Sequence, residues 1–68
     1  MGEPKFPDAF VQLTGEDGNM GAIMGRVVRE LKRVGARPDD IRDFRMSIMG
    51  AASYDDALNR VGQWVEVG

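Results

Sequence analysis

This chain of 68 residues contains no cysteine and no histidine. Without cysteine it can form no disulfide. A zinc ion would have to be held by carboxylates alone, although zinc usually takes thiolate and imidazole ligands. The thiol nucleophile and the usual proton shuttle of enzymes are missing as well. We therefore expect no catalytic residues, no resident metal, no cofactor and no enzymatic activity.

Long apolar runs are also missing. No stretch approaches the roughly 18 apolar residues that cross a membrane, and the first residues lack the basic start and apolar run of a secretory signal. We expect a cytoplasmic protein with no membrane partner. Prolines 4 and 7 indicate a flexible N-terminal arm, residues 1–8, ahead of a single small domain, residues 9–68.

The short length limits stability, because a domain of this size buries only about 60% of the surface that its unfolded chain exposes. Small domains often add a disulfide, a metal or a partner subunit to compensate. Since the composition disfavours the first two, association with a second copy is the remaining support. A homodimer is accordingly one expectation.

A strand and a helix are predicted in the first half of the chain. Val11 and Leu13 share one face of an alternating run at residues 10–14, which indicates a half-buried strand. Asn19 is a good helix N-cap, and Gly35 is a good C-terminal stop. Between them apolar side chains recur at steps of three and four residues, namely Met20, Ile23, Met24, Val27, Val28, Leu31 and Val34.

Two further helices are predicted in the second half. Pro38, followed by two aspartates, suits the first turn of one helix, and Gly50 ends it. Ser53 and Asp56 form a variant of the capping box at the start of the next. The expected buried faces are Ile41, Phe44, Ile48 and Met49 in the second helix, and Tyr54, Ala57 or Leu58, Val61 and Trp64 in the third.

The last residues alternate again, with Glu66 between Val65 and Val67. A strand at residues 10–14 needs a partner for its backbone groups, so we pair the two ends of the chain. The expected fold is α+β, with three short helices packed on a small two-stranded sheet formed by the N- and C-terminal strands. The alternative is a third helix that continues to Val67.

Positive charge follows one side of the first predicted helix. The five cations between residues 26 and 37, set against one glutamate, give this segment a net charge of +4, whereas the whole chain carries −2. They are Arg26, Arg29, Arg33 and Arg37, which follow one stripe at steps of three and four residues, and Lys32, which lies to its side. We call these residues the basic stripe and expect it to contact an anionic partner. The plainer alternative is a solvated helix face paired with Asp39, Asp40 or Asp43.

Methionine is abundant, with five residues in the chain. Met20, Met24 and Met49 lie on predicted inner faces and are expected to fill the core. Met46 falls off the inner face of its helix. If exposed, it marks a contact patch for a partner or a second subunit.

The loop before the first helix contains Glu16, Asp17, Gly18 and Asn19. A strand, a glycine-rich turn and a helix N-terminus together can bind phosphate, but neither common phosphate-loop motif is present and the two acids would repel an anion. The acids could instead bind a hard cation such as calcium, although the spacing is not that of an EF-hand. The plain interpretation is a turn whose acids interact with the helix dipole.

The chain contains four short motifs, of which the first is fairly specific and the later ones lie in generic helices. Val-Gln-Leu-Thr-Gly-Glu-Asp-Gly-Asn at residues 11–19 is followed by Ile-Met-Gly-Arg-Val at 23–27, Ser-Tyr-Asp-Asp at 53–56 and Trp-Val-Glu-Val at 64–67. With these motifs, residues 10–67 resemble a family of small uncharacterised proteins of bacteriophages, including phages of actinobacteria, and of their hosts. The resemblance implies a phage or prophage context, and hence a bacterial host cytoplasm, with a host-directed or regulatory role.

Three functions follow as hypotheses. The preferred one is a non-enzymatic protein-interaction or regulatory module that contacts a host or phage protein through the basic stripe and Met46. The second is a nucleic-acid-binding protein that uses the same cations on phosphates. The third is a small metal- or phosphate-binding domain that uses the loop of residues 15–19.

Overall fold

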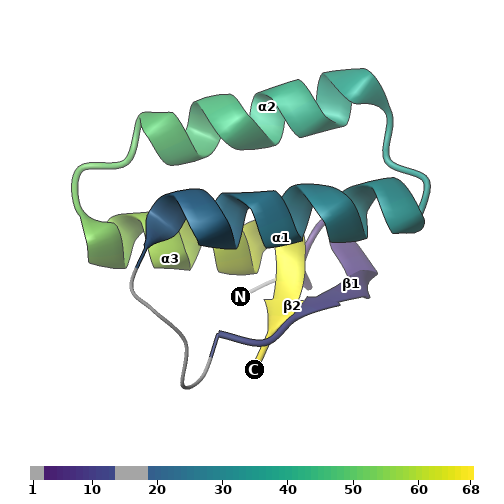
Figure 1. The fold of residues 1–68 in the computed structure, drawn as a ribbon, viewed down its shortest axis with the longest axis horizontal. Coiled ribbons are helices and arrows are strands. Elements are labelled where there is room, and N and C mark those ends of the chain that lie inside the picture. Colours follow the sequence, from purple (N-terminus) through teal and green to yellow (C-terminus); the bar gives the residue numbers. More distant parts are fainter. Residues whose placement is uncertain (1–2, 14–18) are drawn as a thin grey trace.

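The computed structural model describes residues 3–13 and 19–68, and these form an α+β fold (Figure 1). The element order is β1 (Phe6–Val11), α1 (Met20–Arg33), α2 (Pro38–Met49), α3 (Tyr54–Trp64) and β2 (Val65–Val67). The two strands form one parallel sheet. The predicted fold class, with a sheet built from both ends of the chain, is confirmed.

The first strand begins earlier than predicted, at Phe6 instead of Phe10. The prediction that residues 6–8 belong to an arm is therefore wrong. The prediction excluded Pro7 from a strand because proline has no N–H to donate to a neighbouring strand. The structure accommodates Pro7 in an irregularity of the pairing, since Phe6 pairs with Val65 but Phe10 already pairs with Glu66.

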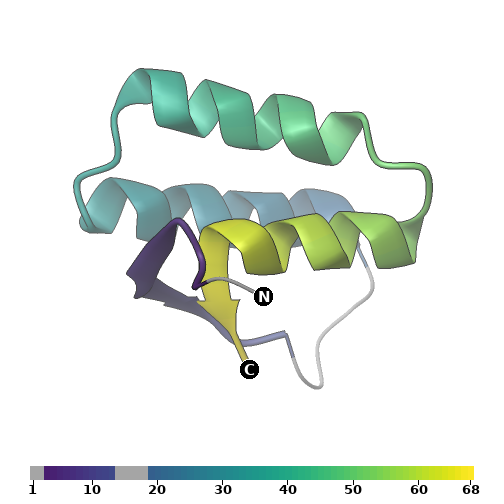
Figure 2. The ribbon, with the colours of Figure 1, turned by 180° about the vertical axis from the view of Figure 1, so that it is seen from behind.

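Backbone hydrogen bonds on both sides of that irregularity join the chain ends. The N–H of Lys5 donates to the carbonyl of Gln63 at 2.9 Å. At the other end, the N–H of Gly68 donates to Val11 at 3.2 Å and the N–H of Leu13 donates to Gly68 at 2.9 Å. The alternative, in which α3 continues to Val67, is wrong because this pairing draws residues 65–67 into the sheet (Figure 2).

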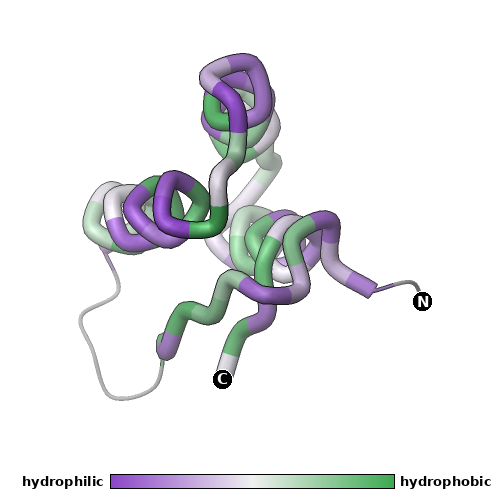
Figure 3. The backbone as a smooth tube through the Cα atoms, turned by 90° about the vertical axis from the view of Figure 1, so that its right-hand side faces the viewer, coloured by the Kyte–Doolittle hydropathy of each residue, from purple (hydrophilic) through white to green (hydrophobic). Residues whose placement is uncertain are grey.

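The elements form three layers (Figure 3). The sheet lies on one side, α1 and α3 cover it side by side, and α2 lies across the far side of both. Phe44 of α2 is fully buried and meets Trp64 edge-on, with ring centroids 5.8 Å apart. Trp64 in turn stacks on Phe6 at 6.2 Å. The aromatic core therefore links α2, the end of α3 and β1.

The predicted helix ends are confirmed by their hydrogen bonds. The Asn19 side chain accepts from the N–H of Gly21 at 2.8 Å, and Ser53 Oγ accepts from the N–H of Asp56 at 3.0 Å. Gly35 follows α1 with a φ of 88°, a left-handed conformation that suits glycine. Gly50 stands at the C-cap of α2.

Arg60 connects α2 to α3. Its Nη1 donates to the carbonyl of Ser47, in the last turn of α2, at 2.8 Å, and its Nε lies 3.3 Å from Asp56. Carbonyls in the last turn of a helix have no partner within that helix and attract positive charge. Arg60 therefore satisfies the C-terminal end of α2 while it holds the two helices together.

The predicted burial of Met49 and Tyr54 is wrong, because their side chains are 80% and 44% exposed. As the outermost layer, α2 fully buries only Phe44 and Ile48, and Met49 projects away from that narrow face. Burial in α3 begins at Ala57, one turn after Tyr54. The other predicted core methionines, Met20 and Met24, are only partly buried at the edge of the core.

Candidate protein-binding surface

The structure divides the basic stripe into parts with different surroundings. All five of its residues are exposed, as predicted. Arg26 and Arg33 reach across to β1, whereas Lys32 lies on the side of α1 that faces α2. Arg37 lies at the N-cap of α2. The stripe is therefore not one continuous contact surface.

Three side chains of α1 cover the edge of β1 that does not pair with β2. Arg33 Nη2 donates to the carbonyl of Asp8 at 3.2 Å, and Arg26 Nη1 donates to the carbonyl of Gln12 at 3.4 Å. Between them, the carboxylate of Glu30 lies close enough to the backbone of Phe10 for that backbone to lower its pKa. We call Arg26, Glu30 and Arg33 the edge cover, because they occupy the hydrogen-bonding positions of a third strand.

The edge cover also contains an ion pair. Arg33 Nε donates to Glu30 Oε1 at 3.0 Å, and Arg33 Nη2 lies 2.8 Å from the same oxygen. This hydrogen bond lowers the pKa of Glu30, aided by the charge of Arg33 and by the backbone of Phe10, against a smaller opposing effect of desolvation. The same carboxylate raises the pKa of Arg33. Both side chains are thus held in their charged forms on the edge of β1.

The lowered pKa values predict how stability depends on pH. Glu30 and Asp56 have pKa values below their ordinary 4.5 and 3.8, the latter mainly because Asp56 accepts from the backbone N–H of Ala52. Such groups stabilise the folded state at pH values above these ordinary values, and the contribution is lost as the pH falls through the folded-state pKa values. In urea denaturation from pH 7 to 3, the double variant Glu30→Gln/Asp56→Asn should therefore lose less stability below about pH 4.5 than the native protein.

Asp43→Asn is the matched control, because the exposed side chain of Asp43 has no hydrogen bond or ion pair within the described part of the chain. It should leave the acid limb of the native curve in place. Parallel curves for the native protein and the double variant between pH 5 and 3 would contradict the assignment.

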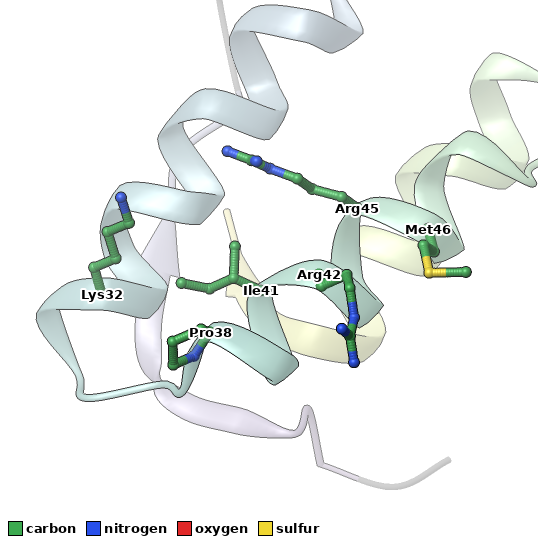
Figure 4. Close-up of a pocket in the computed structure, with 6 residues that line it drawn as sticks. All are labelled: Lys32, Pro38, Ile41, Arg42, Arg45 and Met46. Atoms are coloured by element: carbon green, nitrogen blue, oxygen red, sulfur yellow. The ribbon is translucent and has the colours of Figure 1, made fainter.

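An open groove of about 460 Å³ lies between the C-terminal part of α1 and the N-terminal part of α2 (Figure 4). Ile41 and Arg45 extend from α2 toward α1. Met46 is 64% exposed, which confirms that it lies off the inner face of its helix. The residues that line the groove are Lys32, Pro38, Ile41, Arg42, Arg45 and Met46.

The cations of the groove are available to a partner. The side chains of Lys32 and Arg45 have no hydrogen bond or ion pair to any other residue that the structure describes. Arg42 lies 3.5 Å from Asp39, but both side chains are largely exposed, at 67% and 81%, and such pairs contribute little stability. The groove therefore places three accessible positive charges around an apolar centre.

Among the residues of this groove, the sequence predicted Lys32 and Met46 as contact residues but not Arg42 and Arg45. A signal was present, because Pro38, Arg42, Arg45 and Met46 follow helical steps and lie on one side of α2. The higher density of cations at residues 26–37 placed the predicted contact surface on the first helix instead. The predicted pairing of the stripe with aspartates of α2 is replaced by other contacts, since Asp39 pairs with Arg42 and Asp40 accepts from the backbone N–H of Arg37.

A second, smaller depression of about 290 Å³ lies over the edge cover. Arg29 lines it together with Arg26 and Glu30 from α1 and with Phe10, Val11 and Gln12 from the strand side. Arg26 already donates to the carbonyl of Gln12, and Glu30 is an acid that pairs with Arg33. It is thus a less favourable place for an anionic ligand than the groove between α1 and α2.

The loop hypothesis is only partly covered by the structure. Asn19 acts as the N-cap of α1, whereas Glu16, Asp17 and Gly18 lie outside the described residues. Within residues 3–13 and 19–68, no cluster of three or more acidic side chains is placed to hold a metal ion. In the same residues, none of the helices has the length and apolar character to cross a membrane.

Comparison with known proteins found no relatives. No protein-family model matches the chain, and neither the curated proteins nor the solved structures gave a significant match. The resemblance to a phage protein family therefore stays a prediction, as does the expected lack of enzymatic activity.

Proposed function

We propose that this protein is a non-enzymatic interaction module of the bacterial cytoplasm that binds an acidic segment of another protein in the groove between α1 and α2. The groove itself carries the proposal, because it combines an apolar centre at Ile41 and Met46 with a rim of three cations. Apolar contact supplies affinity at a protein interface, and complementary charge supplies selectivity and rapid association.

A protein partner suits this surface better than a nucleic acid. Nucleic-acid-binding domains usually carry a net positive charge, whereas this chain carries −2. Arg26 and Arg33, two of the cations in the basic stripe, already bond to β1. The apolar centre of the groove offers nothing to a phosphate backbone but can pack against the side chains of a protein.

Binding of defined probes tests the proposal. Fluorescein-labelled peptides of mixed glutamate and leucine, and a labelled short DNA duplex, are titrated with the protein at about 150 mM salt and followed by anisotropy. The peptides should bind and the duplex should not. Arg45→Glu, in the groove, should weaken peptide binding at least about tenfold, which corresponds to about 1.4 kcal/mol.

Arg29→Glu is the matched control, because it makes the same change of charge at an exposed position outside the groove. It should change peptide affinity by no more than about twofold, equivalent to about 0.4 kcal/mol. Equal losses in both variants would show attraction by net charge alone and would overturn the proposal. Duplex binding that is abolished by Arg45→Glu would establish a nucleic-acid site instead.

A further inference from the structure

We infer that the groove accepts its partner as a short amphipathic α-helix with acidic residues on both sides of an apolar stripe. This inference rests on the function proposed above and adds the conformation and polarity of the bound segment. It follows from the backbone groups that the groove presents, from its length and from the placement of its cations.

The walls of the groove offer an incoming backbone no hydrogen-bonding edge. Both walls are helices, α1 and α2, so neither presents the edge of a strand. At the end of α1 the carbonyls of Leu31 and Lys32 already accept from the segment that follows, and Pro38 has no N–H. An extended segment buried here would lose hydrogen bonds to water and gain none from the walls. A helix satisfies its own backbone groups and presents only side chains. The groove therefore favours a helical occupant.

The dimensions of the apolar surface suit a helix of about three turns. The groove extends along α2 from Pro38 to Met46, a rise of roughly 12 Å at 1.5 Å per residue. Met49 continues the exposed apolar surface by almost one further turn and lies outside the core. Methionine side chains repack easily around a partner. A stripe of apolar residues at steps of three and four would reach from Ile41 to Met49.

Cations come from both helices that form the groove. Lys32 belongs to α1, whereas Arg42 and Arg45 belong to α2 (Figure 4). A helix lying over Ile41 would therefore meet positive charge along two sides of its apolar stripe. Acidic residues at the borders of the stripe, spaced by helical steps, satisfy this arrangement. The exposed pair between Arg42 and Asp39 can exchange for such a contact at little cost.

Two peptides of identical composition test the conformation. Both contain about 14 residues of leucine and glutamate, one with leucine at helical steps and the other with strict alternation of the two residues. Affinity is measured by anisotropy, the site by amide NMR shifts of the protein, and peptide helicity by circular dichroism. The helical peptide should bind at least about tenfold more tightly, shift the amides of residues 38–49 and gain helicity on binding.

A third peptide, with proline in the middle of the helical sequence, should lose at least about tenfold in affinity, because proline interrupts a helix. Arg45→Glu and Arg29→Glu serve again as groove variant and control. If all peptides bind the groove equally, with loss only in Arg45→Glu, the proposed function stands and the helical inference fails. If no peptide shifts the groove amides, both fail.

Discussion

Phe44→Ala should remove about 3–5 kcal/mol of the protein's stability and lower its urea denaturation midpoint steeply. Phe44 is fully buried in α2 and contacts Trp64, through which the aromatic core continues to β1. Removal of a buried phenylalanine side chain costs about 3–5 kcal/mol. A domain of this length has a total stability of only about 3–10 kcal/mol, at 0.05–0.15 kcal/mol per residue. Circular dichroism and tryptophan fluorescence during urea denaturation would show the loss.

Met49→Ala, on the same helix, is the control for this experiment. Because Met49 is 80% exposed, its truncation should change the free energy of unfolding by no more than about 0.5 kcal/mol. The two variants together test whether α2 contributes a single narrow face to the core. Similar denaturation midpoints for Phe44→Ala and the native protein would contradict the described packing.

Removal of the edge cover should make the protein self-associate. In the triple variant Arg26→Ala/Glu30→Ala/Arg33→Ala, the carbonyls of Asp8 and Gln12 and the backbone of Phe10 lose their partners on α1. A strand edge with unpaired backbone groups is a template for pairing with another chain. The apparent mass in light scattering should therefore rise with protein concentration more steeply than for the native protein.

The double variant Arg29→Ala/Lys32→Ala separates this effect from a change in surface charge. It also removes side chains from the exposed surface of α1, but neither side chain has a hydrogen bond or ion pair to the described residues of β1. It should follow the native protein in light scattering at every concentration. If the triple variant does the same, the edge cover does not protect the sheet. Another part of the chain would then be what keeps the edge of β1 from pairing.

The helices could be read from the sequence because their signals are local. Asn19, Pro38, Ser53 and Gly35 act through hydrogen bonds or backbone angles within a few residues, and each lies at the predicted helix end. The pairing of the chain ends also followed, since a single short strand cannot satisfy its own backbone groups. The start of β1 was missed because Pro7 lies in an irregularity of the pairing between β1 and β2, which the sequence does not reveal.

The candidate site was recovered only in part for a related reason. Helical spacing places cations on a common side of α1, but it does not show which neighbour that side meets. Packing against β1 draws Arg26 and Arg33 into the edge cover, and packing against α2 combines Lys32 with Arg42 and Arg45. These groupings join residues from elements that are separate in the chain.

Short-range chemistry in the chain thus established the helices, their caps and the absence of disulfides. The order of the layers settled the remaining features, namely the exposure of Met49 and Tyr54, the covered edge of β1 and the cation-lined groove. The physical reason is that a cap or a helical repeat depends on neighbours in sequence. Burial and the surroundings of a charge depend on neighbours in space.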